Sequence, residues 1–380
     1  MSKEKIRPGR VVVYAGALLA YFIGAGFASG QEVLQFYSAW GHDLFIVAAV
    51  AFFMIAWSVI SYARAGAVGE FTENSQVFKF YCGKYIGTFF DYFSVIYCFC
   101  CYIYMCAGAG STLNQRFGVP PIVGAMLMAA LVIVSVFLGL HKITEILGRL
   151  GTAIIVLVLF IALWNLIANF GDLGANLTAI SEDYTQFGME RTIAPNAFMA
   201  GVSYVGATII WTTAFVAMMS SKADRKREVK IGMAVGAVFI ALGLLLCALA
   251  IVSVAGQVGA SDIPTLLMAA NIWEPLASIY AIFIVAGIYT SAVPLLWTST
   301  ARFTKEGTPR FKLLCTVMGI AGLVIALFVP YKTLVNYILT LGGYVVCVFF
   351  VILVVTDIRR MVLARRAKEA LDAEATEPEA

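Results

Sequence analysis

The chain has 380 residues, of which 61% are hydrophobic and 13% are charged. Soluble globular chains carry roughly 25% charged residues, so this composition excludes a cytosolic enzyme, a nucleic-acid-binding protein and a disordered scaffold. The mean hydropathy of +0.90 and the small net charge of +4 both indicate a protein whose natural solvent is the lipid bilayer.

Ten apolar segments follow one another along the chain, and most are long enough to cross a hydrocarbon core, which takes about 20 helical residues. Helices are expected because isolated strands would leave backbone groups unpaired in lipid. The sequence therefore predicts an all-α membrane protein with about ten transmembrane helices. The segments cover residues 11–37, 43–63, 85–109, 119–139, 150–169, 195–219, 230–254, 273–300, 311–329 and 332–356.

The positive charges predict how these segments are oriented. If the N-terminus is cytoplasmic and ten spans alternate, every Lys and Arg lies on the cytoplasmic side except Arg116, Arg191 and Lys332. Cytoplasmic loops of membrane proteins carry an excess of Lys and Arg, and a missed span would scramble this asymmetry. The sequence thus predicts a multi-pass protein of the bacterial inner membrane with both termini in the cytoplasm.

The first apolar segment is a poor continuous helix. Gly24, Gly26 and Gly30 lie within seven residues, and Gln31 and Glu32 follow them. Each glycine costs close to 1 kcal/mol relative to alanine in a helix interior. Close packing against another helix is the other common use of glycine in membranes, so this segment alone leaves both interpretations open.

The sixth segment has a similar pattern, with Gly201, Ser203, Tyr204 and Gly206 after its opening proline, Pro195. Corresponding glycine interruptions in two halves of a membrane protein indicate an inverted-repeat transporter whose binding site lies at the breaks. Because five is an odd number, a second half of five spans enters the membrane from the opposite side, as an inverted repeat requires. The predicted organisation is a cytoplasmic N-terminus (1–10), a first repeat (11–169), an extracytoplasmic loop (170–194), a second repeat (195–356) and a cytoplasmic tail (357–380).

A broken helix frees backbone groups for ligand binding. The carbonyls between Ala20 and Gly24 suit a hard cation such as Na⁺, and the amides near Gly26, Phe27 and Ala28 suit an anionic group of a solute. In the eighth segment, Thr290 and Ser291 follow Gly287 and precede a proline. Buried hydroxyls usually bond to their own helix. Two adjacent hydroxyls between a glycine and a proline are a stronger indication that their oxygen atoms bind a cation.

The stretch from Phe22 to Glu32 resembles the start of the YkvI-like family, poorly characterised bacterial members of the amino acid–polyamine–organocation superfamily. The ten-segment layout over residues 11–356 is similar to the LeuT-type repeat of five plus five helices. The resemblance implies a secondary transporter with discontinuous helices one and six, in which spans one, two, six and seven rock against spans three, four, five and eight. The pair Gln31-Glu32 departs from the gating arginine of neurotransmitter-type relatives.

The resemblance also implies ligands, residue by residue. Sodium would take main-chain carbonyls from Ala20, Ile23 and Gly287 and hydroxyls from Thr290 and Ser291. A substrate carboxylate would lie at Gly24, Ala25 and Gly26, and the rest of the ligand at the stretch from Gly201 to Gly206. Tyr97 would line the site from the third helix; the alternative for it and the other tyrosines of this segment is a role in packing or at the membrane interface.

Two carboxylates within the spans need a partner or a cavity, because an ionised side chain at mid-bilayer costs about 2.5–3.5 kcal/mol. Glu32 and Asp91 are therefore candidates for a contact with a substrate amine or for proton coupling, and the alternative for each is an interfacial carboxylate in water.

The function predicted from these features is symport of a small amino-acid-like or zwitterionic solute, with Na⁺ favoured as coupling ion. Two alternatives stay open: proton coupling through Glu32 or Asp91, and a membrane sensor that keeps a transporter fold. No P-loop and no catalytic motif is present, so we expect neither an enzyme nor a cofactor, and no nucleic-acid partner.

Overall fold

The computed structural model describes residues 6–22, 25–71, 74–138 and 144–374, and over these ranges the chain forms α-helices and short 3-10 helices without a strand. The first half contains α1 (Pro8–Phe22), α2 (Ala25–Ser29), α3 (Gln31–Phe36), η1 (Ser38–Asp43), α4 (Leu44–Val68), α5 (Asn74–Phe117), α6 (Pro121–Leu138) and α7 (Thr144–Ala168). The predicted all-α fold is confirmed.

A connection of short helices, η3 (Phe170–Asp172), α8 (Leu173–Glu182) and η4 (Tyr184–Phe187), leads into the second half. That half contains α9 (Ala197–Lys222), α10 (Lys226–Ser253), α11 (Ala255–Val258), α12 (Pro264–Ile272), α13 (Glu274–Ala301), α14 (Pro309–Phe328) and α15 (Tyr331–Glu374).

Within the described ranges, six helices are long and apolar enough to cross a membrane, or up to eight if each of two bent helix pairs is one span. One bent pair is α9, whose parts Ala197–Gly206 and Ile209–Lys222 meet at 48°. Two shorter apolar helices, Pro8–Leu19 and Pro121–Phe137, lie where the sequence predicts further spans. The chain is thus a multi-pass membrane protein whose helices follow the predicted segments.

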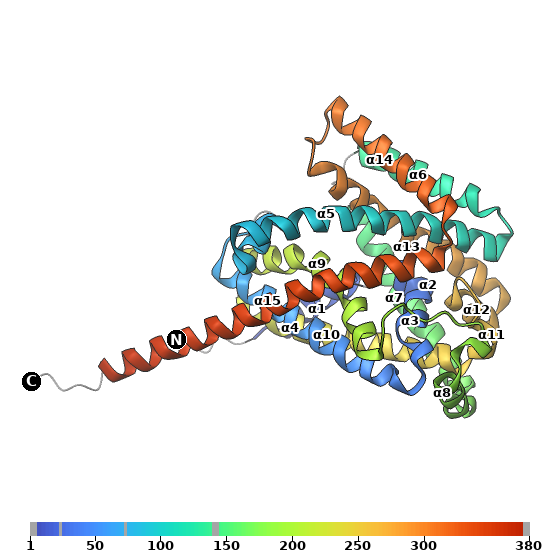
Figure 1. Cartoon of the computed structure of the whole chain (residues 1–380), viewed down its shortest axis with the longest axis horizontal. Helices are drawn as coiled ribbons and strands as arrows, with labels where there is room; N and C mark the ends of the chain where they lie inside the picture. Colours follow the sequence, from blue (N-terminus) through green and yellow to red (C-terminus); the bar gives the residue numbers. More distant parts are fainter. Residues whose placement is uncertain (1–5, 23–24, 72–73, 139–143, 375–380) are drawn as a thin grey trace, which may run out of the picture.

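Two predicted segments are longer as helices than the apolar pattern suggests. In the third, a separate helical stretch from Asn74 precedes the segment and meets the rest of α5 at the non-helical Gly83 (φ 71°). The tenth, α15, continues as a helix through most of the predicted tail, and its 44 residues make about 66 Å at 1.5 Å per residue. Its last turns project away from the bundle (Figure 1).

The spans assemble into two groups. In the first group α4 packs along α9, and α10 packs against both α1 and α4. In the second, α5 and α13 pack along each other, and α6 and α7 also contact α13. These groups correspond to spans one, two, six and seven and to spans three, four, five and eight, while α14 and α15 flank them.

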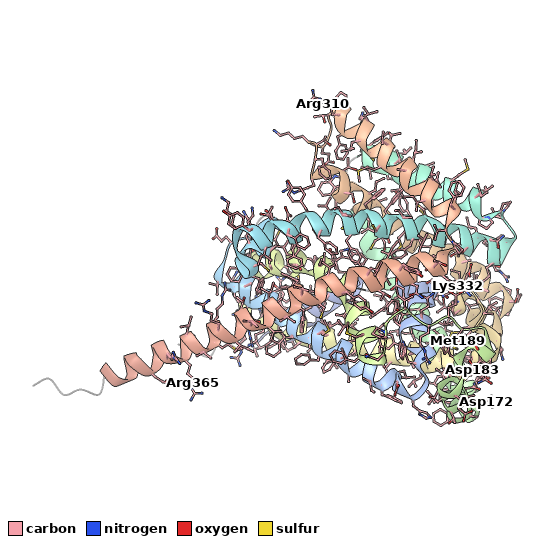
Figure 2. The ribbon with its side chains drawn as sticks, in the orientation of Figure 1. Asp172, Asp183, Met189, Arg310, Lys332 and Arg365 are labelled. Carbon is pink, nitrogen blue, oxygen red and sulfur yellow. The ribbon has the colours of Figure 1, made fainter. Side chains whose placement is uncertain are left out.

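The connection between the halves covers one end of the bundle. The Ser181 hydroxyl of α8 accepts a hydrogen bond from the His42 amide at 2.9 Å, and the Arg191 guanidinium donates to the Ala39 carbonyl at 2.8 and 2.9 Å. Asp172, Asp183 and Met189 mark this end in Figure 2, where Arg365 lies far away on the projecting end of α15. The predicted loop 170–194 therefore packs on η1 at this end of the bundle.

Two helices of the second half, α9 and α15, meet in a backbone contact between glycines. A Cβ added to Gly343 of α15 would lie 2.2 Å from the Ser203 carbonyl oxygen of α9, and one added to Gly206 would lie 2.3 Å from the Gly343 Cα. Small residues that let two helices approach so closely are typical of packing in membranes.

We expect Gly343→Ala to lower the free energy of unfolding by about 1–3 kcal/mol, because the added methyl group overpacks this contact. Gly16→Ala in α1 is the matched control, since nothing lies within 4 Å of the added Cβ, and it should be neutral or slightly stabilising. Thermal unfolding of the detergent-purified protein measures both. Equal midpoints for the two variants would contradict this packing.

Candidate functional site

The first span is discontinuous, as predicted. The structure describes α1 up to Phe22 and α2 from Ala25, and the predicted ligands Ile23 and Gly24 lie outside the described residues. A break lies at Gly30, whose φ of 78° is in the left-handed region that glycine adopts without strain. A Cβ at Gly30 would also lie 2.7 Å from the Thr265 side chain. Between Ala25 and Phe36 the chain thus forms two short helices, α2 and α3, in place of one continuous helix.

Side chains from neighbouring helices satisfy the backbone groups near this break. The Ala28 carbonyl accepts hydrogen bonds from the Thr265 hydroxyl of α12 at 2.6 Å and from the Tyr280 hydroxyl of α13 at 2.5 Å. The Ser29 hydroxyl donates to the Gly26 carbonyl at 2.8 Å and lies 3.0 Å from the Tyr331 hydroxyl of α15. Helix α2 is therefore held by side chains from three other elements.

The Glu32 carboxylate folds back against this short helix. A Cβ added to Gly26 would lie 1.5 Å from Glu32 Oε1, so only glycine leaves room for the carboxylate there. Glu32 is 9% exposed, and Oε1 accepts a hydrogen bond from the Tyr104 hydroxyl at 3.3 Å. In the described part of the chain, no ion pair within 4.0 Å neutralises Glu32.

An aromatic wall on α5 and α9 lies nearby. The Tyr97 ring stacks on Trp211 with centroids 6.2 Å apart, and it packs so closely on Gly342 that an added Cβ there would lie 2.1 Å from the ring. Tyr97 is 3% exposed, and its hydroxyl is buried without a hydrogen-bond partner. Because buried hydroxyls are normally paired, this hydroxyl is available to a ligand.

The predicted residues of the sixth segment have mainly packing contacts. Gly201 faces α4, where an added Cβ would lie 2.9 Å from the Val47 carbonyl oxygen, and Gly206 faces Gly343. The Ser203 hydroxyl donates to the Ala200 carbonyl of its own helix at 3.0 Å, and Tyr204 packs edge-on against the Tyr37 ring. The bend of α9 follows Gly206 directly, so the break lies at the end of the predicted stretch rather than within it.

The predicted sodium ligands of α13 lie within one helical turn. The Thr290 hydroxyl donates to the Gly287 carbonyl at 2.8 Å, and a Cβ at Gly287 would lie 2.9 Å from Ile154 of α7. Pro294 lies inside α13 and removes the usual partner of the Thr290 carbonyl. Ser291 is half-buried. Ala20 lies in α1, which packs mainly along α10.

Asp91 is engaged elsewhere. Its Oδ2 accepts hydrogen bonds from Arg302 Nη2 at 2.8 Å and Nε at 3.1 Å, and this guanidinium also lies over the Tyr92 ring. Asp91 precedes Tyr104, the residue that contacts Glu32, by about 20 Å along α5. The two candidate carboxylates therefore occupy different places, and Asp91 already has a cationic partner.

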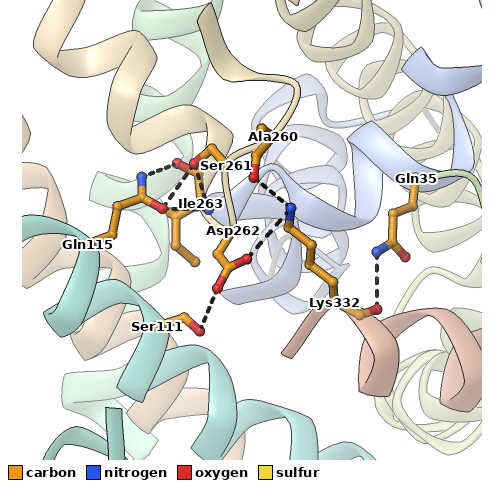
Figure 3. A network of polar contacts seen from close by, with 8 residues as sticks. All are labelled: Gln35, Ser111, Gln115, Ala260, Ser261, Asp262, Ile263 and Lys332. Atoms are coloured by element: carbon orange, nitrogen blue, oxygen red, sulfur yellow. Dashed lines mark hydrogen bonds and ion pairs between the residues drawn. The ribbon is translucent and has the colours of Figure 1, made fainter. Parts of the chain in front are cut away.

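A polar network closes the site on the side of α12 (Figure 3). Asp262 accepts a hydrogen bond from the Ser111 hydroxyl at 3.1 Å and pairs with Lys332 at 3.7 Å. Gln115 of α5 donates to the Ile263 carbonyl at 3.0 Å. Gln31, with its amide oriented to satisfy its neighbours, donates to the Ser261 and Asp262 carbonyls. The segment before α12 is thus tied to α3, α5 and α15.

The sequence did not single out several residues that build this site. Thr265, Tyr280 and Tyr331 bind α2 through their hydroxyl groups, and the ion pair of Asp262 with Lys332 fixes the segment before α12. Their only signal was a polar or tyrosine residue near the end of an apolar run, which many residues share. Tyr104 lies in the tyrosine-rich third segment, where no sequence feature distinguishes it from the neighbouring tyrosines.

Comparison with known proteins gives a likeness in structure. No family model and no curated protein sequence matches the chain. A mutant of the manganese transporter of Eremococcus coleocola matches at 14% identity over 92% of this chain and 79% of that chain, with a TM-score of 0.56. MhsT in complex with L-phenylalanine matches at 14% identity over 90% of this chain and 88% of that chain, with a TM-score of 0.58.

Mhp1, a nucleobase-cation-symport-1 family transporter in a closed conformation with bromovinylhydantoin bound, matches at 15% identity over 88% of this chain and 75% of that chain, with a TM-score of 0.51. These identities show the fold alone. The chain has the LeuT-type fold, two inverted five-helix repeats in which helices one and six are discontinuous.

Proposed function

We propose that this protein is a secondary active transporter that moves a small solute by alternating access. The observation that carries the proposal is the Glu32 carboxylate, buried against Gly26 at the breaks of the first span. The solved structures that share its fold include transporters, which supports the class. Membership of the YkvI-like family and an inner-membrane location with both termini cytoplasmic belong to the same proposal.

The solute we propose is amino-acid-like or zwitterionic. Its amine would face Glu32 and the hydroxyls of Tyr97 and Tyr104, because a carboxylate and hydroxyl oxygens accept hydrogen bonds from an ammonium group. Its carboxylate would lie at the backbone from Gly24 to Ala28. The stretch from Gly201 to Gly206 would line the opposite side through Ser203 and Tyr204.

Glu32 is also the coupling group that the contacts favour. A buried carboxylate without a cationic partner is costly in a membrane, so a cation that neutralises it would stabilise the loaded state. A proton does this with the least rearrangement, because the protonated carboxyl group can then donate a hydrogen bond. Asp91 is less suited, since Arg302 already pairs with it.

Sodium is the second candidate for the coupling ion. The Gly287 carbonyl, the Thr290 hydroxyl and Ser291 offer oxygen atoms on one turn of α13, and Pro294 leaves the Thr290 carbonyl without its usual partner. Ala20 and Ile23 would supply carbonyls from the first span. This arrangement needs the Thr290 hydroxyl to turn from Gly287 toward the ion.

Alternating access would use the two groups of helices. The group of α1, α4, α9 and α10 has extensive internal contacts, as has the group of α5, α6 and α13; α7 packs against both α13 and α10. Rocking of one group against the other would expose the Glu32 region to each side in turn. The network of Asp262, Lys332 and Gln115 would open on the side of α12.

We expect Glu32→Gln to abolish the response of uptake to a proton gradient, because the amide cannot take up and release a proton. A thermal-shift screen with amino acids identifies a solute that stabilises the protein, and uptake of that solute into proteoliposomes is then measured with and without an inward proton gradient. Asp91→Asn is the control, and it should keep the response. An unchanged response in Glu32→Gln would exclude proton coupling at this residue.

The sodium alternative makes a separate prediction. If Na⁺ binds α13, it should raise the midpoint of thermal unfolding, and Thr290→Ala should remove this shift while leaving the unfolding of the ion-free protein nearly unchanged. Equal stabilisation by K⁺ and choline would exclude a sodium site. Solute binding without counterflow in proteoliposomes would contradict transport and favour a membrane sensor.

A further inference from the structure

A groove opens between α4 and α15, far from the Glu32 region. It has a volume of about 390 Å³ and is lined by Phe52, Phe53, Trp57 and Ile60 of α4 and by Met361 of α15, with Arg64 at one end. From Phe52 to Arg64 it follows α4 for about 18 Å. Its size falls in the range of small-molecule pockets, roughly 300–1,000 Å³.

The groove lies between two contacts of α4 with α15. The Phe53 and Phe350 rings have centroids 6.3 Å apart, and Arg64 lies against Met361 eleven residues further along α15. Phe53 is 52% exposed and Met361 44% exposed. In a membrane, this apolar wedge is open to the lipid.

Positive charges converge at the Arg64 end of the groove. Arg64 Nη1 lies 3.9 Å from the Met361 sulfur, and both Arg64 and Arg227 lie within electrostatic reach of Lys230 on α10. Arg360 of α15 lies over the Phe80 ring at 3.6 Å. Asp357 of α15 is an acidic group near both Arg64 and Arg360, and it offsets one of their two positive charges.

We propose that this groove binds an anionic phospholipid, with an acyl chain along Phe52, Phe53 and Trp57 and the phosphate at Arg64. An apolar groove that ends in basic residues matches the two parts of such a lipid, and basic pockets between membrane helices bind anionic head groups. A second copy of the chain in the same membrane would bring an identical basic cluster to the same depth, and the like charges would repel each other.

The test measures the affinity of the detergent-purified full chain for phosphatidylglycerol and phosphatidylcholine by native mass spectrometry. Phosphatidylglycerol should bind about tenfold more tightly than phosphatidylcholine, and Arg64→Gln should lose about fivefold of that affinity. Arg365→Gln is the matched control, because Arg365 lies further along α15 and pairs with Glu369 on its own helix. It should bind the lipid as the unchanged protein does.

A second variant tests the apolar part of the groove. Ala56 also lines it, so Ala56→Trp should fill it and lower phosphatidylglycerol affinity even if Arg64→Gln fails to fold. Three results would each overturn the proposal. They are an equal loss of phosphatidylglycerol affinity in the Arg64 and Arg365 variants, unchanged affinity in Ala56→Trp, and binding of inorganic phosphate as tight as that of phosphatidylglycerol. So would a lipid-free dimer that Ala56→Trp dissociates, because a second copy would then occupy the groove.

Discussion

The structure depends on one constraint: a backbone interrupted inside a membrane must find its hydrogen-bond partners within the protein. Helix α2 meets this requirement through other spans, since two hydroxyls, from Thr265 and Tyr280, donate to the single carbonyl of Ala28. The breaks therefore bind α12, α13 and α15 around the first span. They also leave room at Gly26 for the Glu32 carboxylate, which an unbroken helix would not offer.

The two groups of helices make contacts of different kinds. Packing is extensive within each group, and α7 also packs against α10 across the two groups. At the break of the first span, the short helix α2 is held to α13 by a hydrogen bond from the Tyr280 hydroxyl. The proposed rocking would exchange polar contacts of this kind, whereas the close contact of Gly206 with Gly343 would keep α9 and α15 together.

The sequence predicted the fold well because hydrophobic length and positive charge are local signals. It predicted a break in the first span from the pattern of Gly24, Gly26 and Gly30, and the described break lies at Gly30. The use of Gly201 and Gly206 in packing needs knowledge of which helices touch. The contact of Glu32 with Gly26 was equally out of reach, because two residues six apart meet only when the helix between them is broken. The pairing of Asp91 with Arg302, across 211 positions, has no local signal.

Hydrogen–deuterium exchange of the protein in lipid nanodiscs tests the discontinuity most directly, and it needs no knowledge of the solute. The account predicts that backbone amides in α2 and α3, and those at the bend after Gly206, exchange much faster than amides in the middle of α5 and α10. Uniformly slow exchange along the first and sixth spans would show two continuous helices and would contradict the account.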